Sequence, residues 1–167
     1  MIIFLTGYMG SGKSKTGELL ARKLGYDFLD TDELIEMSQG KSIKRIFQDS
    51  GEEYFRHIEM ETLHSLGEKK NVVVATGGGL PCFSNNMEWI NAHGISVYFK
   101  VPVAMLIQRL LNDRGERPLL QSLTEAELAE KVRKQMESRE EYYLASKIVF
   151  DIAHQNLNVL IREISAY

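Results

Sequence analysis

The chain has 167 residues, a length that fits one domain with a buried core and argues against two full domains. Hydrophobic residues make up 44% and charged residues 26%, with only 3 prolines, which excludes disordered, collagen-like and low-complexity chains. The 20 basic and 23 acidic residues give a net charge of -3, so the chain lacks the positive charge of a general nucleic-acid binder. Its single cysteine, Cys82, cannot form an internal disulfide, and no apolar run approaches the ~18 residues of a membrane span. We therefore expect a cytoplasmic protein that binds neither nucleic acid nor membrane.

Apolar runs and helix signals alternate along the chain. Uniformly apolar runs predict buried strands at 2–6, 26–29, 72–76, 95–99 and 148–152. Helices are predicted over 13–24, 32–38, from about 42, over 50–66, 84–93, 102–111, 124–142 and 157–164, with capping boxes at Ser50–Glu53 and Thr124–Glu127 and a further N-cap at Ser84. This order predicts one α/β domain over 1–167, a parallel sheet covered by helices on both faces, with ligands at the carboxyl ends of the strands.

A phosphate-binding motif lies between the first predicted strand and helix. The segment from Gly7 to Ser14, GYMGSGKS, fits the pattern GxxxxGK[ST] in the expected context. Its glycines let successive backbone N–H groups surround phosphate oxygens, and the following helix N-terminus adds partial positive charge. Lys13 would reach the terminal phosphates, and the Ser14 hydroxyl would ligate Mg²⁺. The chain has no NKxD motif, which argues against a regulatory GTPase.

Two carboxylates, Asp30 and Asp32, follow the second predicted strand. Their spacing in an extended segment would point both side chains the same way. One could hold Mg²⁺ through water while the other binds an acceptor hydroxyl and takes its proton. The alternative is that Asp32 simply caps the next helix.

A second glycine-rich segment, 76–79, ends the third predicted strand. Three successive glycines suggest that a ligand lies against the backbone, although a bare turn is the alternative. Arg56 and Glu59 are three residues apart on one predicted helix face, so the acid could hold the guanidinium in place. The alternative is an ordinary solvated pair.

Charge and turn residues fill the segment 112–122, which lacks an apolar period and predicts a mobile excursion. It contains Arg117, and Arg139 lies near the end of the next predicted helix. In isolation each reads as a surface arginine. The histidines show no metal-ligand spacing, and Cys82 reads as a small buried thiol.

Taken together, these motifs resemble the shikimate kinase family, in order and over nearly the whole chain. The matching segments are GYMGSGKS, FLDTD, GEEYFRHIE, TGGG, RPLL and SREEYY. The resemblance implies a P-loop kinase fold like that of nucleoside monophosphate kinases, with about five parallel strands, an acceptor-binding segment near 32–61 and a lid near 112–123. It also implies a monomer that uses ATP and Mg²⁺ to phosphorylate the 3-hydroxyl of shikimate, giving shikimate 3-phosphate and ADP for aromatic amino acid biosynthesis.

The resemblance also implies roles for individual residues. Asp32 would be the candidate base, Glu59 would hold Arg56, and Arg117 would close over the transferred phosphate. The catalytic residues would be Lys13, Asp32 and Arg117, and Mg²⁺ would be held by Ser14 and Asp30. Arg109 would lie near adenine, and ATP as a whole would contact Gly10, Ser11, Gly12, Lys13, Ser14, Lys15, Arg109 and Arg117. Shikimate would contact Asp32, Arg56, Gly77, Gly78, Gly79 and Arg139.

The chain departs from the family pattern at the adenine end. Members often carry a Thr at the end of the last strand and a later Pro, whereas the segment 150–157 reads FDIAHQNL. We expect that loop to hold adenine differently. Two other readings stay open at this point: another small kinase, for gluconate or a nucleoside monophosphate, and a nucleotide-binding module without catalysis.

Overall fold

The computed structural model describes residues 1–113 and 123–167, and the strands of this part form one sheet. The strand order is β2-β3-β1-β4-β5, and every neighbouring pair is parallel. The strands are β1 Ile2–Thr6, β2 Asp27–Asp30, β3 Val72–Ala75, β4 Ile95–Lys100 and β5 Ile148–Asp151. The predicted five-stranded parallel sheet is confirmed. Parallel strands that are apolar throughout need cover on both faces.

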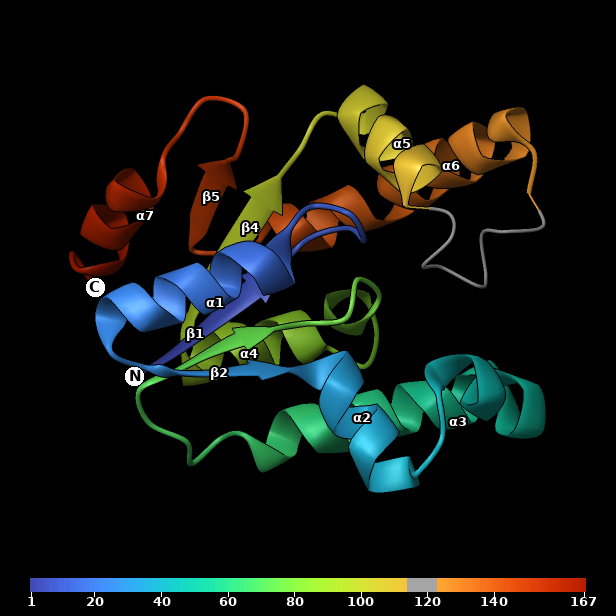
Figure 1. Cartoon of the computed structure of the whole chain (residues 1–167). Helices are drawn as coiled ribbons and strands as arrows, with labels where there is room; N and C mark the ends of the chain where they lie inside the picture. The colour runs from blue at the N-terminus through green and yellow to red at the C-terminus, as the bar shows by residue number, and fades with distance from the viewer. Residues whose placement is uncertain (114–122) are drawn as a thin grey trace.

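Helices follow the strands as the alternating pattern predicts. They are α1 Lys13–Leu24, α2 Thr31–Gln39, α3 Ile43–Ser65, the short 3₁₀ helix η1 Leu80–Cys82, α4 Asn86–His93, α5 Val103–Asn112, α6 Glu125–Leu144 and α7 Leu157–Ile164. The pair α2–α3 and the pair α5–α6 lie at opposite ends of the row of strands (Figure 1). Within the described ranges, no helix combines the length and the apolar character needed to cross a membrane.

Alternate residues of the central strand β1 serve two cores. Ile3 and Leu5 pack in a cluster with α1 and α7, and Ile2 and Phe4 pack in another with α3 and α4. All four side chains are at most 3% exposed. Because successive side chains of a strand point to opposite faces, β1 is buried on both sides. The sheet is therefore rigid at its centre, and its carboxyl edge is a firm base for loops.

The helix starts predicted near 42 and near 50 are both found in α3. The Ser42 side chain caps its first half, and a break at Gly51, where φ is 80°, precedes its second half, so the cap predicted at Ser50 lies one residue too early. Glycine supports this left-handed backbone without strain. The cap predicted at Ser84 belongs to Asn85, which makes no side-chain cap bond. By contrast, the capping box predicted at Thr124 is confirmed at the start of α6.

Candidate active site

A cavity of about 690 Å³ opens at the carboxyl ends of β1, β2 and β3. This is where a parallel α/β sheet binds its ligands. The residues that line it are Met9, Gly10, Ser11, Gly12, Lys13, Ser14, Lys15, Thr16, Asp30, Asp32, Thr76, Gly78, Arg109, Asp113 and Ile152. The structure thus brings the predicted phosphate loop, both predicted carboxylates and part of the second glycine loop into one space.

The phosphate loop takes a backbone conformation that depends on glycine. Gly10 and Gly12 have φ values of 79° and 91°, in the left-handed region that other residues rarely occupy. The buried Lys13 ammonium donates to the carbonyl oxygens of Gly7, at 2.7 Å, and Tyr8, at 3.0 Å. The loop therefore holds a positive charge within its curve, beside the N-terminus of α1.

The two residues expected to hold a metal ion are in contact. The Ser14 hydroxyl donates to Asp30 Oδ2 at 2.7 Å. The other oxygen, Asp30 Oδ1, accepts from the backbone N–H of Asp32 at 2.9 Å and caps α2. The capping role considered for Asp32 therefore belongs to Asp30, and Asp32 lies in the first turn of α2, not in an extended segment. A hydroxyl and a carboxylate oxygen are donors of the kind that Mg²⁺ takes together with phosphate oxygens and water.

Asp32 is closely packed by its neighbours, several of which carry a charge. A Cβ on Gly77 would come within 2.5 Å of Asp32 Oδ1 and 3.2 Å of Glu59 Oε1, so only glycine fits between the two acids. Burial raises the pKa of Asp32 to about 6; the Asp30 carboxylate adds to this rise, and the Lys13 ammonium opposes it. An acid with this pKa is ionised near neutral pH and is basic enough to accept a proton.

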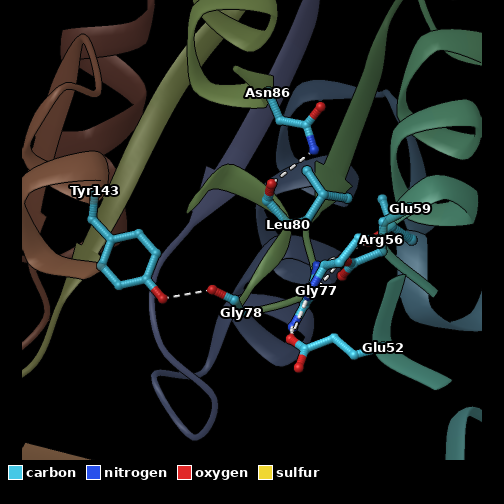
Figure 2. Close-up of polar contacts among 9 residues, drawn as sticks. Glu52, Arg56, Glu59, Gly77, Gly78, Leu80, Asn86 and Tyr143 are labelled. Atoms are coloured by element: carbon cyan, nitrogen blue, oxygen red, sulfur yellow. Dashed lines mark hydrogen bonds and ion pairs between the residues drawn. The ribbon is translucent and has the colours of Figure 1, made fainter. Parts of the chain in front are cut away.

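Arg56 is held on several sides by its neighbours. Its NH1 group donates to Glu59, and its Nε and NH2 groups donate to Glu52 Oε1 at 3.3 and 3.0 Å (Figure 2). Its guanidinium carbon also lies 4.1 Å from the centre of the Phe83 ring, a cation–π contact. The Arg56 side chain is 15% exposed, so the predicted pair with Glu59 is a part of the site and not a solvated surface pair.

Glu59 is the more deeply buried acid of this group, with a side chain 2% exposed. Burial raises its pKa to about 7, while the contact with Arg56 opposes the rise and the charge of Asp32 adds to it. Such a carboxylate gains its stability from a fixed cation beside it. Glu59 therefore holds Arg56 in place, and the Arg56 cation in turn stabilises the buried charge of Glu59.

Arg139 reaches the same region from α6. Its guanidinium carbon lies 5.9 Å from the centre of the Tyr8 ring. Both Arg139 and Arg56 act electrostatically on Glu59 and on the half-buried Cys82 thiol, whose pKa burial raises to about 11. The fold thus brings together two arginines that are far apart in the sequence. Cys82 is a weakly acidic, half-buried thiol, in line with its interpretation as a packed side chain.

The second glycine loop forms the wall between the two halves of the site. A Cβ on Gly78 would meet the Met9 backbone nitrogen at 3.2 Å, and one on Gly79 would lie 2.6 Å from Arg56 NH1. The Gly77 N–H donates to the Thr31 hydroxyl at 2.8 Å. The loop therefore packs against the phosphate loop on one side and against Arg56 on the other, which is more than a bare turn requires.

The remaining predicted nucleotide contacts, Arg109 and Lys15, also line the cavity. Arg109 NH1 donates to the carbonyl oxygens of Gly10, at 3.1 Å, and Ser11, at 3.3 Å. Lys15 is exposed and lines the cavity. Arg117 and most of the predicted lid, residues 114–122, lie outside the described residues.

The loop after β5 is organised by Asp151. Its carboxylate accepts from the Ala153 N–H and contacts His154 Nδ1, both at 3.0 Å, and its own N–H donates to Gln155 Oε1 at 2.7 Å. The next residue, Ile152, lines the cavity. These bonds order a loop that lacks the threonine and proline of the family pattern.

Three residues around Arg56 and Arg139 were not anticipated from the sequence. Glu52 and Tyr143 each lie four residues from an arginine already singled out, and this helical spacing could have pointed to them. Phe83 contacts Arg56 only through the fold, so no spacing in the sequence signals it.

Comparisons with known proteins agree with this geometry. The family model for shikimate kinase matches residues 9–166. The chain is 42% identical over 163 residues to the shikimate kinase of Azobacteroides pseudotrichonymphae, covering 97% of this chain and 96% of that protein. It is 40% identical over 149 residues to the shikimate kinase of Bacteroides thetaiotaomicron, covering 89% of this chain and 85% of that protein.

Solved structures show the same likeness. The crystal structure of shikimate kinase from Bacteroides thetaiotaomicron is 36% identical, with a TM-score of 0.89, covering 99% of this chain and 95% of that one. Shikimate kinase from Acinetobacter baumannii in complex with shikimate is 35% identical, with a TM-score of 0.85, covering 98% and 90%. A gluconokinase from Sinorhizobium meliloti, at 21% identity, a TM-score of 0.55 and coverage of 98% and 89%, shares the fold alone.

Proposed function

The chain belongs to the shikimate kinase family, whose members transfer a phosphoryl group from ATP to shikimate, and we propose how the residues of its cavity divide this task. The observation that carries the proposal is the convergence of two arginines and a carboxylate beside the phosphate loop. Arg56 and Arg139 act on the same buried acid, Glu59, and Asp32 lies next to that acid across Gly77. The arrangement suits an anionic acceptor whose hydroxyl faces a nucleotide.

On the nucleotide side, the phosphate loop binds the phosphates of ATP through its backbone N–H groups and Lys13. Ser14 and Asp30, already joined by a hydrogen bond, would hold Mg²⁺. The ion would neutralise charge on the phosphate oxygens. Lys13 adds a fixed positive charge beside the oxygens that separate from ADP, and Arg109 and Ile152 border the space for the rest of the nucleotide.

On the acceptor side, Asp32 accepts the hydroxyl proton of shikimate as that oxygen bonds to the terminal phosphorus and the bond to ADP breaks. The carboxylate of shikimate lies between Arg56 and Arg139, which donate charge-assisted hydrogen bonds to it. The glycine loop completes the wall, because its lack of side chains lets the ring lie against the backbone.

The raised pKa of Asp32 predicts opposite pH dependences for activity and stability. Between about pH 4 and 6 the folded chain binds the Asp32 proton more tightly than the unfolded chain, so this contribution to stability is lost as the pH rises through about 6. Activity needs the ionised form, so kcat/KM for shikimate should rise over the same interval.

The pH profile of kcat/KM, measured beside thermal melting at each pH, checks this expectation. Asp32→Asn should abolish turnover and leave the fold intact. It should also remove the pH dependence of the melting temperature that Asp32 causes. A profile that stays level down to pH 5 would remove Asp32 as the base. Because Glu59 titrates near pH 7, the profile is repeated in Glu59→Gln, which retains Asp32.

An ADP-release assay over a small panel of acceptors tests the proposed function. Shikimate should support steady ADP release, whereas gluconate and nucleoside monophosphates should give only the background rate. Faster release with gluconate or a nucleoside monophosphate would assign the chain to another kinase. Binding of ATP without ADP release for any acceptor would point to a nucleotide-binding module.

A further inference from the structure

One face of α6 contacts both loops of the active site. Gln135, Arg139 and Tyr143 follow one another at intervals of four residues, so they share this face. The Tyr8 hydroxyl of the phosphate loop donates to Gln135 Oε1 at 2.5 Å, and the Tyr143 hydroxyl donates to the carbonyl oxygen of Gly78 at 2.5 Å. Arg139 stands between these two anchor points.

Tyr143 is buried, and its hydroxyl donates a hydrogen bond to the glycine loop. The side chain has 0% exposure, and its ring stacks on Tyr98 with centres 5.3 Å apart. Burial raises the pKa of Tyr143, so the hydroxyl keeps its proton at any pH at which the enzyme works. That single proton goes to Gly78, and the charge of the Arg139 guanidinium, one helical turn away on α6, opposes the rise in the pKa of Tyr143.

Arg139 can satisfy Tyr143 and still bind an acceptor. A guanidinium carries five N–H donors, so an electrostatic contact with the phenol oxygen leaves donors free to meet a carboxylate. This contact restricts the rotation of a long side chain, which otherwise loses conformational entropy when it meets its ligand. The hydroxyl therefore acts on Arg139 before the acceptor arrives.

The same hydroxyl holds the glycine loop. Gly78 packs against the backbone of the phosphate loop, and its neighbour Gly79 packs against Arg56. Figure 2 shows Tyr143 approaching this loop from the side opposite Arg56. One phenol thus links Arg139 to the loop that borders Arg56, the other arginine of the carboxylate site.

We propose that Tyr143 is a positioning residue for acceptor recognition, whose hydroxyl fixes the glycine loop and Arg139 in the arrangement that receives the acceptor carboxylate. This inference rests on the proposed function, because it assumes that Arg56 and Arg139 bind that carboxylate. Tyr143 acts through these groups and contacts neither the phosphoryl group nor the acceptor hydroxyl.

The test compares Tyr143→Phe with Tyr98→Phe. Both changes remove one hydroxyl from a buried, stacked ring, and Tyr98 serves as the matched control outside the acceptor site. Tyr143→Phe should raise KM for shikimate roughly tenfold, as the loss of a buried hydrogen bond would, with little change in KM for ATP. Tyr98→Phe should leave both constants near those of the unchanged enzyme.

A double-mutant cycle with Arg139→Ala separates positioning from general support of the fold. If the hydroxyl acts through Arg139, its removal should weaken shikimate binding less in the Arg139→Ala background than in the unchanged enzyme. Equal effects in both backgrounds, or equal effects of Tyr143→Phe and Tyr98→Phe, would overturn the proposal. So would a Tyr143→Phe chain that fails to fold while Tyr98→Phe folds, since the hydroxyl would then serve the fold.

The two proposals fail in distinguishable ways. An unchanged enzyme that does not phosphorylate shikimate contradicts the proposed function. An unchanged enzyme that does so, with a Tyr143→Phe variant indistinguishable from the control, contradicts only the role of Tyr143.

Discussion

Lys13→Ala is expected to lower kcat by at least about a hundredfold, the loss typical when a positioned charge or donor at the transition state is removed. Lys13 lies within the curve of the phosphate loop, where its ammonium donates to the carbonyl oxygens of Gly7 and Tyr8. The charge that it neutralises grows as the phosphoryl group separates from ADP. The loss should therefore be larger in kcat than in the affinity for ATP.

Steady-state kinetics with ATP and shikimate, together with thermal melting, measure this effect. Lys23→Ala is the matched control, because Lys23 is an exposed lysine in the last turn of the same helix, α1. It should retain normal turnover. If Lys13→Ala melts normally and also turns over at nearly the normal rate, the phosphate loop has been assigned wrongly.

Arg56→Ala and Arg139→Ala should each weaken shikimate binding roughly tenfold to a hundredfold or more while leaving ATP binding nearly unchanged. Each guanidinium would donate charge-assisted hydrogen bonds to one carboxylate in a partly dry pocket. The loss of either guanidinium would therefore cost about 1.5–3 kcal/mol of binding free energy. Arg56→Ala also leaves the buried Glu59 without its cation, so it should lower the melting temperature more than Arg139→Ala does.

Calorimetric titration with shikimate and, separately, with an ATP analogue checks both variants. Arg45→Ala is the control for Arg56→Ala, because Arg45 lies on the same helix α3, is 64% exposed and pairs with the surface residue Asp49. Adding Glu59→Gln to Arg56→Ala should restore part of the lost stability but none of the lost binding. A variant that binds shikimate as well as the unchanged enzyme would remove that arginine from the carboxylate site.

Much of the fold could be predicted because the apolar composition of the strands indicates that they are buried. The run from Val72 to Ala75 is apolar at every position, which indicates a strand covered on both faces, and the structure buries all four residues. The start of α6 was equally readable, since a capping box is a local interaction of residues three apart. The start of the second half of α3 was predicted to within one residue from the spacing of Ser50 and Glu53, and the positive φ of Gly51 sets its observed position.

The sequence predicted only those parts of the site whose interacting residues lie close together in the chain. The phosphate loop and the pair Arg56 and Glu59 follow from spacing, since their partners lie within a few residues. The contact of Tyr143 with Gly78, and the raised pKa values of Asp32 and Glu59, depend on burial and on which segments the sheet brings together. No local pattern carries that information.

Shikimate methyl ester tests the central claim most directly, because it keeps every hydroxyl of the acid and removes only the charge. If Arg56 and Arg139 bind the carboxylate, the unchanged enzyme should phosphorylate the ester with kcat/KM lower than for the acid by roughly tenfold to a hundredfold or more. If the ester is phosphorylated as well as the acid, the two arginines do not recognise the carboxylate, and a neutral polyol becomes the better candidate for the acceptor.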